Sequence, residues 1–163
     1  MITFEKYNMT LDVDVEKTKA YYQNRPQLEN IEIKNFEKQA KEAAPLLNDF
    51  LTELGVDITK PDELCYCWKD EKGILHYNVA YTVTGRIIRA IQYEAILQDK
   101  SALHLVLETE YVPNKQTEPY FAFTIYNIEM PWILEEAFPE MKKVENTARE
   151  SFLKKITKKL KKH

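Results

Sequence analysis

Hydrophobic and polar positions alternate along three stretches of the middle of the chain, a pattern typical of strands with one buried face. In residues 74–83, for example, Leu75, Tyr77 and Val79 alternate with polar or small side chains. Short turn sequences separate the stretches, and short connections join antiparallel strands. The pattern therefore predicts an antiparallel sheet with strands at 74–83, 102–112 and 120–130, preceded by a shorter strand at 64–69.

Two other stretches fit more than one kind of element. Residues 86–97 follow Thr84-Gly85, which suits a tight turn into a further strand, but their isoleucines also fit one face of a helix. We expect the strand, because strands that follow one another in sequence commonly pair. Residues 7–15 alternate as a strand does, whereas Asp12 or Asp14 suits the N-cap of a helix.

Apolar residues at intervals of three and four predict helices before and after the strands. A short helix is expected over 17–23, and a longer one over 33–54, which Pro45 should kink or split and Gly55 should end. A final helix is expected to begin near Pro139. Its apolar stripe consists of Met141, Val144, Ala148, Phe152, Ile156 and Leu160.

These elements predict one α+β domain that spans residues 1–163, a length suited to a single core. An N-terminal strand and helices precede a curved antiparallel sheet of about four to six strands, which a long C-terminal amphipathic helix closes. The order of elements is similar to that of helix-grip folds, and cone-shaped α+β layouts share it. A likeness of fold alone implies no function.

Charge is distributed unevenly along the chain. The last 22 residues hold nine basic and two acidic side chains, a net charge of +7, so residues 1–141 carry −10 of the formal total of −3. A basic amphipathic helix suits an anionic membrane, a nucleic acid or an acidic partner. We expect this helix to dock on the acidic body of its own chain, which attracts it, and lysines near a helix C-terminus are favoured by the helix dipole. The acidic body repels phosphate, which argues against a nucleic acid, and no aromatic residue anchors the last turns, which argues against a membrane.

Composition narrows the class of protein further. The first residues lack the basic start and apolar block of a signal peptide, and no apolar run reaches the roughly 18 residues of a membrane span. Two cysteines make no disulfide framework, and three glycines leave no glycine-rich phosphate loop. We therefore expect a cytoplasmic protein without a membrane span, nucleic acid or bound cofactor.

The residues that could carry chemistry form no recognisable constellation. Cys65 and Cys67 share a strand face, but the second pair of ligands that zinc sites require is missing. His76 and His104 fall on the face opposite the leucines and tyrosines, which we interpret as solvated. Asp12-Val13-Asp14 is best interpreted as exposed charge on an edge strand. No catalytic residue and no metal ligand is predicted.

Tyrosines on the expected core face are the more informative residues. Several hydroxyls on a concave apolar face suit a pocket for an amphipathic small molecule, although a filled core accommodates them too. The tryptophans stand at strand ends, where they suit the rim of such a pocket. The candidate ligand-binding residues are Tyr77, Tyr81, Tyr93, Tyr111, Trp68 and Trp132.

Three classes of function follow from these observations. The first is a non-catalytic binding module that holds an amphipathic small molecule between sheet and C-terminal helix. The second is an interaction protein of the immunity or inhibitor type, whose acidic body binds a basic protein partner. The third, which we favour least, is a small enzyme that uses cavity residues such as Tyr77, Tyr81 or Cys67. Neither the ligand nor the oligomeric state follows from the sequence.

Overall fold

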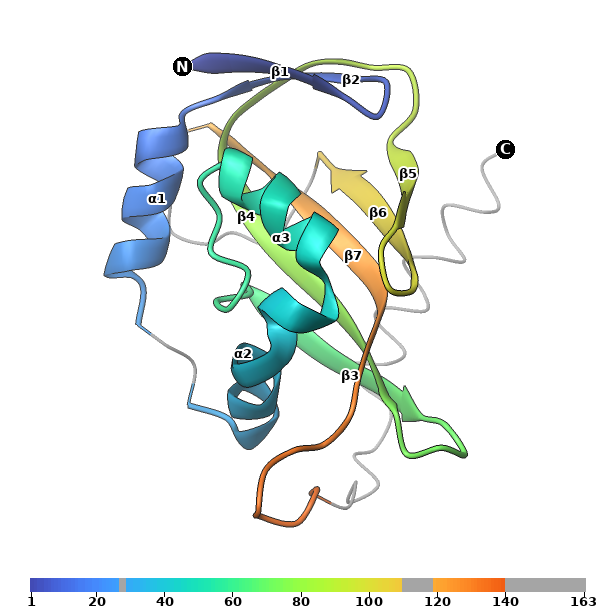
Figure 1. Cartoon of the computed structure of the whole chain (residues 1–163). Coiled ribbons are helices and arrows are strands. Elements are labelled where there is room, and N and C mark those ends of the chain that lie inside the picture. Colours follow the sequence, from blue (N-terminus) through green and yellow to red (C-terminus); the bar gives the residue numbers. More distant parts are fainter. Residues whose placement is uncertain (27–28, 110–118, 140–163) are drawn as a thin grey trace. The chain divides into compact units, whose positions relative to one another are not determined.

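The computed structural model describes residues 1–26, 29–109 and 119–139 (Figure 1). The chain divides into two compact units, Met1–Ile133 and Leu134–His163, and all the elements described below belong to the first. In chain order they are β1 (Ile2–Lys6), β2 (Met9–Val13), α1 (Val15–Asn24), α2 (Ile31–Ala43), α3 (Pro45–Glu53), β3 (Glu63–Lys69), β4 (Leu75–Ala90), β5 (Glu94–Gln98), β6 (Ala102–Glu108) and β7 (Tyr120–Met130).

The seven strands form one antiparallel sheet in the order β1-β2-β4-β7-β6-β5, with β3 also paired to β4. The 16-residue β4 is the longest strand and pairs with β2, β3 and β7. One of its edges pairs with β7, while the other pairs first with β3 and then with β2, so that Ala80 lies opposite Glu63 and Gly85 opposite Val13. The two short strands therefore share one edge of the long one.

Gly85 lies inside β4 and not in a turn, so the predicted hairpin at Thr84-Gly85 is wrong. Its φ of +152° is a backbone conformation that other residues rarely adopt, and a Cβ there would lie 2.1 Å from the Asp12 carbonyl oxygen. Glycine thus lets the strand continue while β2 approaches closely. The strand interpretation of residues 86–97 is confirmed, because β4 extends to Ala90 and β5 follows.

Local signals begin and end the helices largely as predicted. Residues 7–15 combine both interpretations, since Met9–Val13 is a strand and the Asp14 side chain accepts the Lys17 amide as the N-cap of α1. The expected break at Pro45 separates α2 from α3. A distant residue caps α3, because the Leu47 amide donates to Asp99 Oδ2 at 2.9 Å.

The core lies between the sheet and the two helices α2 and α3, which cover one of its faces (Figure 1). Aromatic side chains meet across this layer: Phe36 of α2 packs edge-on against Tyr77, and Phe50 of α3 against Phe123, with ring centroids 6.3 and 5.4 Å apart. All four are buried. Burial of each such side chain contributes about 2 kcal/mol.

The prediction of an antiparallel, sheet-rich α+β protein is confirmed, but the layout predicted for it is wrong. Two N-terminal strands join the same sheet, which has seven strands and not four to six. The three helices in the described ranges are short and precede β3, and a long C-terminal helix is not shown. Its predicted stripe, Met141–Leu160, lies outside the described residues. Apolar residues at intervals of three and four show which side of a helix would be buried. Whether the helix forms depends mainly on the packing of that side against the rest of the protein.

Candidate functional site

Two of the candidate tyrosines fill the core. Tyr77 and Tyr81 point from β4 toward the helices and are fully buried. The Tyr81 hydroxyl donates to the Ile58 carbonyl oxygen at 2.7 Å, and the Tyr77 ring packs edge-on against Phe36 and Tyr66. Burial raises the pKa of both hydroxyls, with smaller contributions from nearby carboxylates. These phenols are therefore weak acids that do not give up their proton at neutral pH.

The remaining candidates lie elsewhere. Trp68 on β3 and Tyr93 between β4 and β5 keep 52% and 46% of their surfaces exposed, and Trp132 after β7 is half-buried. Tyr111 lies outside the described residues. Because Trp68 faces the side of the sheet opposite Tyr77, the described candidates do not gather at one site. Ligand binding by these residues stays a prediction.

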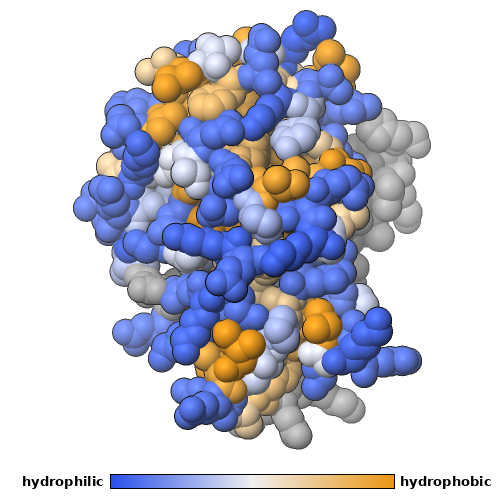
Figure 2. Space-filling view, viewed as in Figure 1, coloured by the Kyte–Doolittle hydropathy of each residue, from blue (hydrophilic) through white to orange (hydrophobic). Residues whose placement is uncertain are grey.

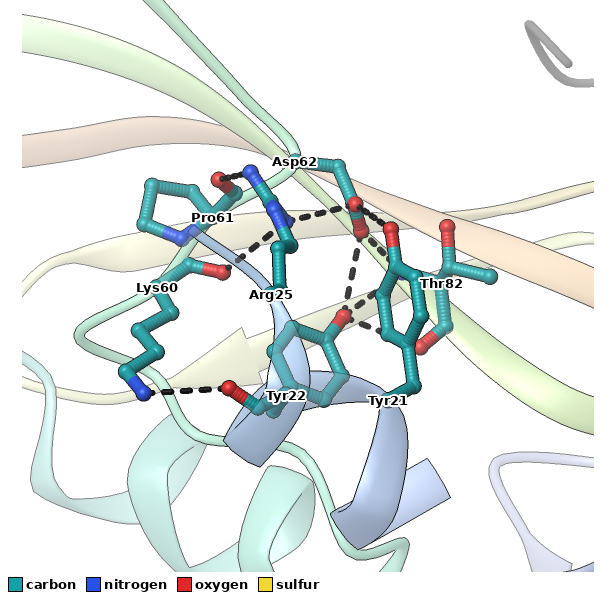
Figure 3. A network of polar contacts seen from close by, with 7 residues as sticks. All are labelled: Tyr21, Tyr22, Arg25, Lys60, Pro61, Asp62 and Thr82. Carbon is teal, nitrogen blue, oxygen red and sulfur yellow. Dashed lines mark hydrogen bonds and ion pairs between the residues drawn. The ribbon is translucent and has the colours of Figure 1, made fainter. Parts of the chain in front are cut away.

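A network of polar contacts that sequence reasoning missed joins α1 to the segment before β3 (Figure 3). Its centre is the Asp62 carboxylate, of which only 7% is exposed. Four donors reach this carboxylate: the hydroxyls of Tyr21 (2.5 Å) and Tyr22 (3.1 Å), Arg25 Nη1 (2.6 Å) and the Thr82 amide (2.7 Å). The carboxylate thus accepts hydrogen bonds from two hydroxyls, one guanidinium and one backbone amide.

The charges in this network are paired within the chain. The Arg25 guanidinium, 14% exposed, completes its contacts on the carbonyl oxygens of Lys60 and Pro61. Burial raises the pKa of the Tyr21 hydroxyl, and its hydrogen bond to Asp62 raises it further. Burial raises the pKa of Tyr22 in the same way, followed by the Asp62 charge. Both hydroxyls therefore stay protonated and act as donors.

The network closes a gap in the sheet. Among the strands in the described ranges, none pairs with the edge of β4 at Thr82 and Thr84, between the ends of β2 and β3. The Tyr22 hydroxyl has one proton, which lies within reach of both Asp62 Oδ2 (3.1 Å) and the Thr82 carbonyl oxygen (2.9 Å). Thr18 Oγ1 accepts a hydrogen bond from the Thr84 amide, and the Asp14 amide donates to the Thr84 carbonyl oxygen. Side chains of α1 and the Asp14 amide take the place of a strand. We assign this network to structure because its donors and acceptors satisfy one another.

The face of the sheet turned away from α2 and α3 differs in character, and we call it the outer face. It consists of the outward-pointing residues of β3, β5, β6, β7 and the first part of β4. They are Glu63, Cys65, Trp68, His76, Asn78, Ala80, Thr82, Thr84, Glu94, Ile96, Gln98, Ala102, His104, Val106, Glu108, Tyr120, Ala122, Thr124, Tyr126 and Glu129. Both internal histidines belong to it. The prediction that both are solvated is wrong for His76, which is buried.

His76 is the most constrained side chain of the outer face. Its ring stacks on the Trp68 indole, with centroids 3.7 Å apart and planes 9° from parallel. Nδ1 lies 2.9 Å from Asn127 Oδ1, and the Asn127 amide nitrogen reaches Glu129 Oε1 at 3.5 Å, so His76 Nδ1 is the donor to Asn127. Nε2 is buried without a hydrogen-bond partner, 3.8 Å from Asp70 Oδ2.

Two irregularities of the sheet create this arrangement. The register of β3 against β4 shifts between Tyr66 and Trp68, and the register of β4 against β7 shifts beside Asn127. Asn127 has a φ of +67°, a left-handed conformation that costs about 1 kcal/mol outside glycine. Bulges of this kind re-aim side chains and are frequent at functional sites. The bulge at Cys67 places Trp68 on the same face as His76.

Titratable groups lie near the stacked pair and elsewhere on the outer face. Backbone amides of Ile74 and Lys72 hold the pKa of the Asp70 carboxyl below its usual range, and His76 adds to this effect. Further across the sheet, His104 Nε2 lies 3.1 Å from Glu94 Oε2. Burial raises the pKa of the Tyr126 hydroxyl, as do nearby glutamates. The outer face therefore combines aromatic rings with ionised carboxylates.

The other chemical candidates have local partners. Asp12 accepts a hydrogen bond from the Thr3 hydroxyl at 2.7 Å, and Asp14 caps α1. The sulfur atoms of Cys65 and Cys67 contact backbone carbonyl oxygens at 3.6 Å. Within the described ranges, histidine, cysteine and carboxylate side chains form no group of three or more that could hold a metal ion.

Comparisons of this chain with protein-family models, with curated proteins and with solved structures found no match. A search of the described helices for a membrane span found none of sufficient length and apolarity. The outer face around Trp68 and His76 therefore has to be interpreted from its own geometry.

Proposed function

We propose that this protein is a non-catalytic binding module whose contact surface is the outer face around Trp68, and that its partner is a basic protein segment. The observation that carries the proposal is the composition of this face. Its exposed residues include the glutamates Glu63, Glu94 and Glu129 and no lysine or arginine. A surface of one sign steers an oppositely charged partner toward it.

Exposed side chains supply the contacts that such a partner needs. Trp68 has half of its surface free, and its indole is the aromatic group that best accepts a cation on its face. The side chains of Glu129 and Glu94 are 41% and 64% exposed, and Ile96 adds apolar area at 55% exposure. Tryptophan is enriched among the residues that dominate binding energy.

Figure 2, viewed from the side of α2 and α3, shows mainly hydrophilic residues, with hydrophobic ones in small separate groups. The net charge of −10 in residues 1–141 supports an acidic body that attracts a basic partner from a distance, and the cytoplasm is the compartment we expect for this encounter.

The test is a titration of the protein with a synthetic peptide rich in arginine and lysine, in which isothermal calorimetry at low salt measures the affinity. We expect Trp68→Ala to weaken binding roughly tenfold and Glu129→Gln or Glu94→Gln roughly threefold each, about 0.7 kcal/mol per charge. The matched controls are Glu16→Gln on α1 and Glu53→Gln on α3, which remove the same charge elsewhere. Equal affinities for all these variants would contradict the proposal.

A further inference from the structure

The surroundings of His76 differ between its two protonation states. In the neutral ring, Nδ1–H donates to Asn127, which leaves the Nε2 lone pair buried and without a hydrogen-bond partner, 3.8 Å from Asp70 Oδ2. A lone pair and a carboxylate oxygen repel each other, and a buried acceptor without a donor is costly. A second proton on Nε2 removes both costs, because it places a positive charge beside the carboxylate.

The polar groups next to the ring favour its charged form, whereas its burial favours the neutral form. β3 contributes the uncharged Trp68 indole, whose face attracts a cation. The β3–β4 turn contributes Asp70, and β7 contributes Asn127 and Glu129, whose Oε1 lies 3.9 Å from Nδ1.

We propose that His76 is a proton-binding site that controls the position of Trp68. The protonated ring holds the indole stacked and fixes the contact surface, and loss of the proton releases it. Histidine titrates between about pH 5 and 8, so the stacked form is favoured on the acidic side of that range and is lost as the pH rises. The regulatory role, though not the proton site itself, rests on the proposed function.

Trp68 itself reports the change. The chain has two tryptophans, so Trp132→Phe leaves Trp68 as the only indole emitter. In this background we expect a one-proton change in Trp68 fluorescence between about pH 5 and 8, which His76→Gln abolishes. Asp70→Asn should move the midpoint toward lower pH, because it removes the nearby carboxylate. His104→Gln, at the exposed histidine, is the matched control and should leave the transition unchanged.

NMR titration of the His76 ring in the Trp132→Phe protein keeps the test decisive if His76→Gln does not fold. Emission that stays flat while the His76 ring signal titrates would overturn the inference. Binding of the basic peptide separates the two proposals. A Trp68 transition without peptide binding at any pH refutes the proposed function alone, whereas equal peptide binding on both sides of a flat profile refutes only the control by His76.

Discussion

Single residues in this protein are held by partners that lie far away in the sequence. Asp62 is the clearest example, because its carboxylate is nearly inaccessible and depends on Arg25 for charge balance. Such a pair is costly to break from one side, since the remaining ion stays buried without compensation. An ion pair at the surface, such as Lys6 with Glu53, is solvated in either state.

We therefore predict that Asp62→Ala lowers the free energy of unfolding by about 3 kcal/mol, as measured by urea denaturation. Glu53→Gln, which breaks an ion pair of similar length (2.9 Å against 2.6 Å), should cost less than about 1 kcal/mol. Similar losses for the two variants would show that the buried network contributes little to stability.

Among the elements, β4 determines how the other strands are arranged. One glycine allows it to change partners along an edge, from β3 to β2, without ending. The segment left between those partners is completed by α1 side chains and by the Asp14 backbone amide. The long strand thus depends on a close approach at Gly85 and on a helix that supplies hydrogen bonds.

Gly85→Ala should destabilise the protein by more than about 2 kcal/mol, because the new Cβ meets backbone at 2.1 Å and φ is positive. Gly73→Ala, in the β3–β4 turn, also has a positive φ (+83°) but meets nothing within 4 Å, and should cost about 1 kcal/mol. Thermal denaturation of both variants makes the comparison. A Gly85→Ala protein as stable as Gly73→Ala would contradict the close approach.

At the scale of the whole molecule, buried tyrosines couple stability to alkaline pH. Burial raises the pKa of the hydroxyls of Tyr21, Tyr22, Tyr77 and Tyr81 above the ordinary value of 10.0. Above that value the unfolded chain loses these protons while the folded chain keeps them, so the folded state binds more protons. Stability is therefore unaffected below about pH 10 and falls as the pH rises further.

We expect the free energy of unfolding to fall by up to about 1.4 kcal/mol per pH unit for each such tyrosine above pH 10. Near-ultraviolet absorbance of tyrosinate, recorded together with circular dichroism, measures this directly. The buried hydroxyls should ionise only as the secondary structure is lost. Ionisation of every tyrosine before any loss of structure would contradict the burial of Tyr22, Tyr77 and Tyr81 and the half-burial of Tyr21.

Local patterns in the sequence determined the type of most elements. Alternation predicted the strands at 74–83 and 120–130, and Pro45 and Gly55 predicted where helices break and end. These features depend on steric preferences of a few neighbouring residues, which are present in any conformation of the chain. The same patterns gave the wrong turn at Gly85, because a positive φ suits a turn and a close strand approach equally.

Only the tertiary structure decided which side chains meet. Asp62 lies 41 and 40 positions from Tyr21 and Tyr22, and Asn127 lies 51 from His76, so no local period relates them. A bulge shifts the alternation of β3 by one residue and so places Trp68 on the face of His76. A strict period of two would place Trp68 on the other face. The candidate site follows from register and long-range pairing, which depend on the energy of the whole sheet.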